Sequence, residues 1–180
     1  MRIRRIISTA AAVLTIAGAV VGGAQATSTG SYLLPSRPEI KVKSILTVGD
    51  SVNNKPDGTP YRMVGIPDGL GAFDNGDGTF TVLMNHELAS PAGIQRAHGA
   101  NSAFVSKWTI DKKSLTVLHG EDLIQQVATW NQAAGAYNEP AAGVVFSRFC
   151  SADLPRKSAF FDDGVGYKGR IFMNGEENGV

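Results

Sequence analysis

The chain has 180 residues, of which 17 are Lys or Arg and 16 are Asp or Glu, so its formal net charge at pH 7 is +1. This balance, without a clustered basic face, excludes a nucleic-acid partner. A single cysteine, Cys150, excludes an internal disulfide framework. The 21 glycines, several of them in Asp-Gly and Asn-Gly dipeptides, are typical of an all-β protein built from short strands and turns.

The first 26 residues are expected to be a secretory signal peptide. They begin with three arginines, continue through an apolar stretch at 6–21, and end in the small-x-small cleavage pattern AQA at 24–26. A membrane anchor, the alternative, needs about 20 strongly apolar residues, whereas this stretch is shorter and diluted by Ala and Gly. The adjacent arginines Arg4 and Arg5 leave twin-arginine export open beside the general secretory route.

Cleavage after residue 26 would leave 154 of the 180 residues, the size of one ordinary domain. Because the lost segment takes three of the 17 basic residues, 14 would face 16 acidic ones, a net charge of −2. No later apolar run is long enough to span a bilayer. The mature chain is therefore expected to be extracellular or periplasmic, with no membrane span.

The mature chain is expected to begin with an N-terminal arm at 27–40, which is polar and contains proline, followed by the folded domain at 41–180. The segment 67–73 reads as a glycine-rich loop or strand edge, and the β-branched and aromatic run 79–85, which follows an Asp-Gly turn, is the strongest strand signal. Short strands are expected at 63–66 and 79–85, and the segment 41–48 is either a short strand or an entry segment.

The second half is expected to add a hairpin, one helical segment and two strands. Alternating apolar residues at 103–110, a polar connection and the run 115–119 predict the hairpin. Apolar residues near helical spacing at 121–134 favour a short helix or helical insertion. The two further strands are expected at 144–149 and 170–173.

Two segments of the chain resemble one another. The sequence GTFTVLMNHE at 78–87 returns, loosened, as GRIFMNGEE at 169–177, so that Glu87 and Glu176 are 89 residues apart. Short strands and glycine turns suggest a sandwich, a barrel or a propeller, and the repetition favours an incomplete β-propeller of about two to three blades. A propeller needs more blades to close, so the chain is expected to be a piece of a larger protein, truncated at its C-terminus.

Four residues are candidate metal ligands. A strand that ends in Asn-x-Glu brings Glu87 to the rim of a sheet. There the carboxylate either binds a hard cation or only ends the strand. His86 should face the opposite side of the sheet. Glu176 and Glu177 point apart in an extended chain, so one can enter a site, or both can belong to an acidic loop. Cys150 follows an apolar strand and is a buried inert thiol, an intermolecular link or a ligand.

Three further features resemble binding sites, but a turn or surface role is favoured for each. The oxygen-rich segment 74–78 resembles a calcium loop, but a hairpin turn is favoured, and a turn role is likewise favoured for Asp68 over metal binding. Arg96 and His98 on one glycine-bounded loop would suit an anionic substrate, although surface polarity is the favoured interpretation. No nucleophile elbow, phosphate loop or zinc-protease motif is present.

The segments PDGLGAF at 67–73, VLMNHEL at 82–88, RAHGA at 96–100 and FVSKW at 104–108 together resemble the PhoX-like family. These are exported bacterial proteins related to the PhoX alkaline phosphatase, and the resemblance resumes at RFC (148–150) and NGEEN (174–178). It implies a β-propeller fold and, for the phosphatase members, a phosphomonoesterase with iron and calcium at the propeller centre.

The resemblance also implies roles for the candidate ligands. It places Glu87 at a metal-binding Asn-His-Glu, Cys150 at a cysteine that ligates iron, and Glu176 or Glu177 at a Glu-Glu pair on the metal cluster, where metals would polarise a phosphoryl group. The Thr-Pro-Trp-Gly-Thr run of the phosphatase members is absent between Cys150 and that pair. The expectation is a fragment of an exported metal-dependent phosphomonoesterase, inactive as an isolated chain; the alternative is a non-catalytic secreted propeller scaffold or binding module.

Overall fold

A computed structural model describes residues 32–177. The predicted signal peptide at 1–26 lies outside these described residues, as does the beginning of the predicted arm. The rest of the arm, residues 32–40, is exposed and forms no strand. Of the two alternatives for 41–48, the structure has an entry segment and not a strand, because this segment runs without strand pairing into a turn closed by the side chain of Asp50, whose Oδ2 accepts a hydrogen bond from Thr47 N at 2.9 Å.

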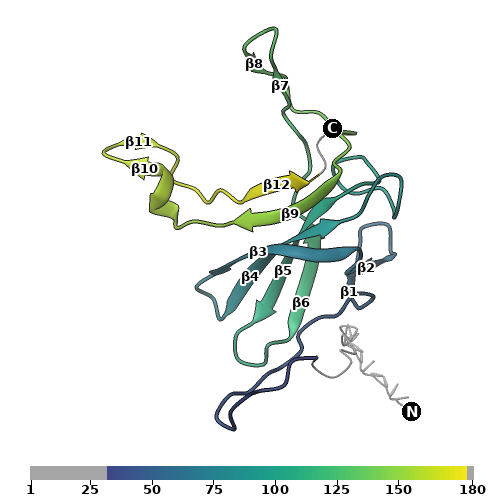
Figure 1. Ribbon diagram of the computed structural model, residues 1–180, viewed down its shortest axis with the longest axis vertical. Helices are drawn as coiled ribbons and strands as arrows, with labels where there is room; N and C mark the ends of the chain where they lie inside the picture. Colours follow the sequence, from purple (N-terminus) through teal and green to yellow (C-terminus); the bar gives the residue numbers. More distant parts are fainter. Residues whose placement is uncertain (1–31, 178–180) are drawn as a thin grey trace, which may run out of the picture.

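Residues 32–177 are all-β, with antiparallel strands, one short 3-10 helix and no α-helix (Figure 1). The elements in chain order are β1 (Ser51–Asn54), β2 (Pro60–Arg62), β3 (Ile66–Asp74), β4 (Thr79–Glu87), β5 (Phe104–Asp111), β6 (Val117–Asp122), β7 (Trp130–Asn131), β8 (Ala136–Tyr137), β9 (Arg148–Asp153), η1 (Lys157–Phe160), β10 (Phe161–Asp162), β11 (Val165–Gly166) and β12 (Met173–Glu177).

One six-stranded sheet carries the fold. Its order is β12-β9-β4-β5-β6, with β3 also paired to β4. Strand β9 meets β4 through a single residue pair, Glu87 with Arg148, at the C-terminal end of β4. The part of the chain that the structure describes forms no closed barrel or propeller. The two copies of the repeat take different positions, since β4 is central and β12 lies at the edge.

The strongest strand predictions are confirmed. The run 79–85 lies within β4, and the predicted hairpin is β5 and β6, paired antiparallel from Ser106–Asp122 to Ile110–Val117. The glycine-rich segment 67–73 belongs to β3, a full partner of β4. The segment 74–78 is a hairpin turn, as favoured, because Asp74 Oδ1 accepts a hydrogen bond from Gly76 N at 2.7 Å.

The predicted helix at 121–134 is wrong. Leu123 N donates to Val105 O at 2.8 Å, so the backbone continues the sheet beyond β6 instead of forming helical bonds. Trp130 then packs edge-on against Tyr137 across the hairpin β7–β8, with ring centroids 5.1 Å apart. The apolar spacing matches that of a helix, but a backbone N–H group of this segment donates its hydrogen bond to a carbonyl of β5 instead. The last two predicted strands are shifted, since β9 begins at Arg148 and β12 at Met173.

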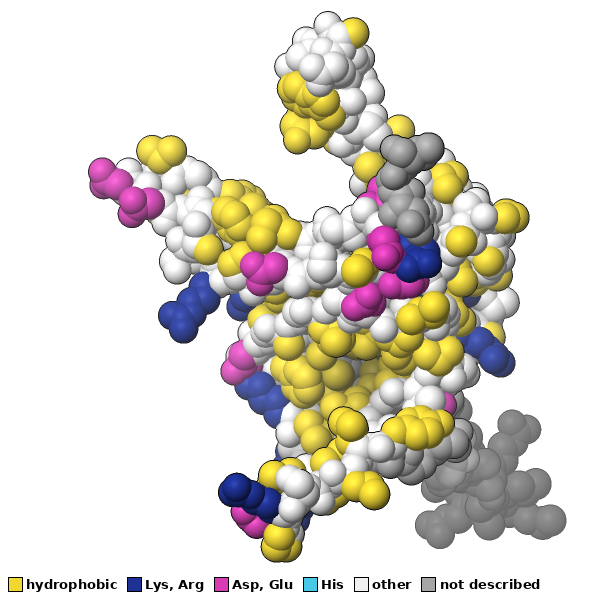
Figure 2. Space-filling model, in the orientation of Figure 1, with side chains coloured by type: hydrophobic (Ala, Val, Ile, Leu, Met, Phe, Trp, Pro, Cys, Tyr) yellow, Lys and Arg dark blue, Asp and Glu magenta, His cyan; other side chains and the backbone are white. Residues whose placement is uncertain are grey.

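Two hairpins project from the body of the protein, β7–β8 and β10–β11 (Figures 1 and 2). Their apolar side chains stay largely in solvent: Trp130 is 51% exposed, Tyr137 71% and Val165 77%. A two-stranded hairpin is marginally stable alone in water. These projections therefore depend on short-range contacts such as the Trp130–Tyr137 pair.

Strands β4 and β5 separate two apolar cores, because successive side chains of a strand face opposite sides. The first core lies on the side of the short β1–β2 sheet, and the second lies on the side covered by β9, with Phe149 in it. Leu83, two residues before Asn85 and four before Glu87, belongs to the second core. Strand alternation therefore turns Glu87 toward β9 and His86 toward the first core.

His86 is fully buried on the side opposite Glu87, as the sequence predicted. Its Nδ1 lies 2.6 Å from Val64 O and its Nε2 2.7 Å from Ser106 Oγ, while the ring stacks on Phe104 at 4.3 Å. Because a carbonyl oxygen only accepts, Nδ1 carries a proton. Burial is the main cause that lowers the pKa of His86 to about 4.

We expect the free energy of unfolding to fall as pH drops from about 6.5 to about 4, by about 3 kcal/mol in full, because the unfolded chain binds a proton on His86 across this window and the folded chain does not. Urea unfolding at a series of pH values measures this. The His86→Gln variant should show a weaker pH dependence than the unaltered chain. An unchanged slope in His86→Gln would contradict the assignment.

Candidate metal centre

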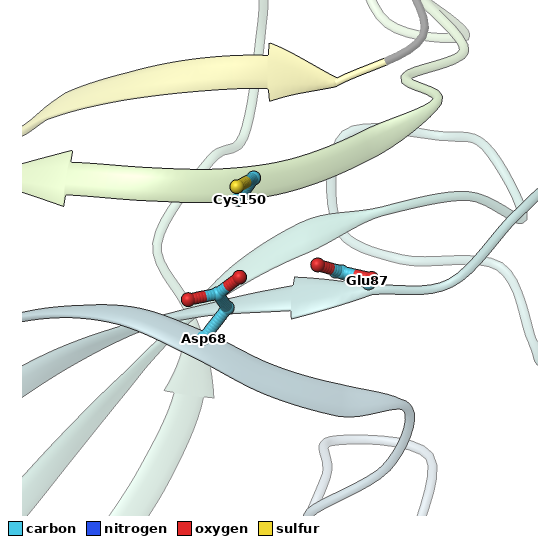
Figure 3. A group of neighbouring side chains, drawn as sticks. All are labelled: Asp68, Glu87 and Cys150. Atoms are coloured by element: carbon cyan, nitrogen blue, oxygen red, sulfur yellow. The ribbon is translucent and has the colours of Figure 1, made fainter.

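Asp68, Glu87 and Cys150 come together at the C-terminal end of β4 (Figure 3). One ligand atom from each, a carboxylate oxygen or the thiol sulfur, lies within 4.8 Å of the other two. The three residues belong to β3, β4 and β9, of which β3 and β4 are consecutive in the chain and β9 follows much later. The Glu87 side chain is only 9% exposed, which is unusual for a carboxylate in a small domain.

A bulge in β3 turns Asp68 toward this cluster. Pro67 pairs with His86 and Leu70 with Met84, so the two residues between them, Asp68 and Gly69, oppose the single residue Asn85. A bulge of this kind redirects a side chain that regular alternation would place elsewhere. Asp68 therefore shares the side of the sheet that carries Glu87.

Gly69 allows the backbone of β9 to approach β3 closely. A Cβ atom at Gly69 would lie 2.5 Å from Ala152 N and 2.7 Å from Cys150 O, distances that no side chain accepts. Only glycine permits such an approach between two backbones. The position of Cys150 beside Asp68 thus depends on the missing side chain of Gly69.

Asn85 ties β9 to β4 next to the cluster. It is fully buried, and its Nδ2 donates to Cys150 O at 3.3 Å and to Ser151 O at 3.2 Å. Its Oδ1 is buried without a hydrogen-bond partner among the described residues. A buried amide oxygen without a donor is costly, and Asn85 lies on the same side of β4 as Glu87.

The cluster carries excess negative charge, which Arg148 offsets in part. Its Nε lies 3.2 Å from Glu87 Oε2, without the geometry of a hydrogen bond, and its Nη2 contacts Glu177 Oε2. Burial, and then the charge of Asp68, raises the pKa of the Cys150 thiol. The thiol is therefore protonated at neutral pH, and a bound metal would have to displace this proton.

The structure brings two of the four predicted ligands into one cluster. Glu87 and Cys150 lie together, whereas Glu176 and Glu177 lie outside the three-residue group. Glu176 Oε1 accepts a hydrogen bond from Ser147 N at 2.5 Å, and Glu177 is paired with Arg148. Both glutamates thus contact the segment of chain that leads into Cys150.

Asp68 is the member of the cluster that sequence reasoning passed over. Its place in Pro67-Asp-Gly69 favours a turn, but the segment is a strand with a bulge. An Asp-Gly pair inside an otherwise apolar alternating run is the signal for such a bulge. That signal indicates a redirected side chain, although not its partners.

Comparisons with protein-family models, with curated proteins and with solved structures return no match for this chain. Among residues 32–177, no helix is long and apolar enough to cross a membrane. A function for this chain therefore has to be argued from the geometry of the cluster and the chemistry of its ligands.

Proposed function

We propose that Asp68, Glu87 and Cys150 bind a metal ion, and that the chain is the metal-binding part of an exported PhoX-like phosphomonoesterase. One observation carries the proposal: ligand atoms from three strands lie within 4.8 Å of one another. The unpartnered Oδ1 of Asn85, on the same side of β4 as Glu87, supports it, because a cation can satisfy an atom of this kind. The β-propeller and the export signal belong to the same proposal.

The ligand types favour iron at this cluster. Carboxylate oxygens suit hard cations such as calcium, but a thiolate suits a transition metal and is foreign to calcium sites. Two carboxylates with one thiolate therefore fit iron better than calcium. Glu176 and Glu177 stay predicted as ligands of a second metal ion beside this centre, which requires that Ser147 N and Arg148 release them. These two carboxylates are an oxygen-only set, which would suit calcium.

A bound metal would polarise the phosphoryl oxygen of a phosphomonoester and offset its charge. The chain's own contribution would be to hold the ligands and the local charge in place. Asn85 fixes β9 against β4, and Gly69 keeps β9 close to β3. A cation bound to Glu87 would release Arg148 from its ion pair with this carboxylate. The Arg148 side chain is 38% exposed and would then be free to bind an anionic substrate.

Cobalt provides the test. We expect Co²⁺, added to the chain after treatment with a chelator, to give a thiolate-to-metal charge-transfer absorption that saturates at one equivalent. The Cys150→Ser variant should lose this absorption, and the matched control Ser151→Ala should keep it. Absence of the band in the unaltered chain, or its persistence in Cys150→Ser, would overturn the metal centre. Iron and calcium contents of the purified protein identify the native metal.

The second candidate is a non-catalytic secreted propeller that serves as a scaffold or binding module. One observation favours it: Arg148 already pairs with both Glu87 and Glu177, so these carboxylates have a partner without any metal. This candidate predicts no saturable cobalt absorption, so saturable cobalt binding would reject it. Hydrolysis of p-nitrophenyl phosphate by this chain would favour the phosphomonoesterase, whereas its absence does not separate the two candidates, because a fragment of the enzyme is expected to be inactive alone.

A further inference from the structure

A groove of about 670 Å³ lies on the side of the sheet opposite the candidate metal centre. Three segments line it, at 53–57, 95–97 and 119–122, together with Tyr61 and Gln125. The ring of Tyr61 packs against Trp108 in the first core, with centroids 5.3 Å apart. The groove thus sits over the first core, and none of its lining residues belongs to the metal centre.

Arg96 forms part of the groove wall and is almost completely buried, with 5% of its surface exposed. This corrects the sequence interpretation of Arg96 and His98 as surface polarity, since His98 is also fully buried. The guanidinium carbon of Arg96 lies 3.6 Å from the centroid of the Phe104 ring, and His86 stacks on Phe104 at 4.3 Å. The stack holds the guanidinium plane in one orientation.

The guanidinium of Arg96 lacks adequate acceptors. Its Nε is buried without a hydrogen-bond partner among the described residues, and its ion pair with Asp122, from Nη1 to Oδ1, is long at 3.5 Å. Asp122 is already engaged, because Oδ1 accepts from Tyr61 Oη at 2.8 Å and Oδ2 from Ala97 N at 2.9 Å. A buried cation whose donors are unmatched costs free energy, which an incoming acceptor would recover.

We propose that this groove binds a small molecule through a carboxylate group that docks on Arg96. A planar carboxylate matches the fork of donors that a guanidinium presents. The lining contains three acidic residues against Lys55 and Arg96, which disfavours a dianion such as phosphate. Arg96 has a buried nitrogen without a partner in the described part of the chain, whereas Lys55 is paired with Asp57, so the wall suits a single negative charge, and the amides of the lining can bind polar groups of the same ligand.

Backbone and side-chain NMR of the whole chain tests the site directly, with sodium propionate as the probe and sodium chloride at equal ionic strength as the reference. We expect propionate to shift the resonances of Arg96, Ala97 and Asp122 in a saturable manner. The Arg96→Gln variant should bind at least tenfold more weakly, and Arg156→Gln, an exposed arginine outside the groove, should bind as the unaltered chain does.

Gln125→Trp provides a second variant in case Arg96→Gln does not fold. It fills the groove from an exposed position and leaves Arg96 and its stack in place, so it should also weaken propionate binding at least tenfold. Shifts that do not saturate, equal binding in these variants, or tighter binding of inorganic phosphate than of propionate would each overturn the proposal. Its outcome is independent of the metal centre, because cobalt binding is measured separately.

Discussion

The Glu87→Gln variant is expected to lose metal affinity by more than the roughly 10–100-fold that is typical of residues that only support ligands. Glutamine keeps the shape of the side chain but removes the charge, and the Glu87 side chain is only 9% exposed. Since Arg148 would still pair with Glu177, the fold should persist. Cobalt titration followed by absorbance measures the affinity, and circular dichroism checks the fold.

Glu177→Gln is the matched control for this experiment. Both glutamates pair with Arg148, but only Glu87 belongs to the three-residue cluster. If the metal is held by Asp68, Glu87 and Cys150, Glu177→Gln should retain most of the affinity. Equal losses in the two variants would instead assign Glu177 as a ligand, as the sequence resemblance implies, and would show that β12 must rearrange on binding.

The Gly69→Ala variant is expected to lower both stability and metal affinity. The added Cβ would meet Ala152 N at 2.5 Å and Cys150 O at 2.7 Å, and these backbone atoms cannot rotate away as a side chain can. Overpacking of this kind typically costs about 1–3 kcal/mol. Relief requires that β9 move away from β3, which would carry Cys150 away from Asp68. Urea unfolding and cobalt titration measure the two effects.

Gly71→Ala separates the loss of stability from the loss of the site. Its added Cβ would meet the Leu154 side chain at 2.5 Å and Phe172 at 3.0 Å, in the second core beyond the cluster. We expect Gly71→Ala to lose stability by a similar amount while retaining more of the cobalt affinity. If the two variants lose affinity in proportion to stability alone, the close approach at Gly69 has no specific role in the metal centre.

The two proposed sites share one structural unit, the pair of strands β4 and β5. Glu87 faces β9 on one side, whereas His86 and Phe104 on the other side support the stack under Arg96. Adjacent residues of β4 thus serve different sites because a strand alternates its side chains. A ligand in the groove and a metal at the cluster are therefore separable by variants on opposite sides of the sheet.

Local sequence was sufficient to predict the strands that are connected by short polar turns. The β-branched run of β4 follows an Asp-Gly turn, and β5 and β6 are joined by a short polar connection, so their positions were predictable. Local sequence failed at 121–134, where helical spacing competed with sheet bonds from Leu123 to Val105. The backbone partners there come from another part of the chain, and spacing alone does not contain them.

The metal centre and the groove likewise depend partly on local sequence and partly on tertiary packing. The amino-acid sequence determined that a carboxylate ends one strand, that a lone thiol follows another, and that Glu87 and His86 face opposite sides, because these follow from residue type and a period of two. Only tertiary packing decided that Asp68 joins Glu87 and Cys150 and that Arg96 is buried. Those outcomes depend on a bulge in β3, the close approach at Gly69 and the stack on Phe104, which are contacts between strands whose register no local pattern specifies.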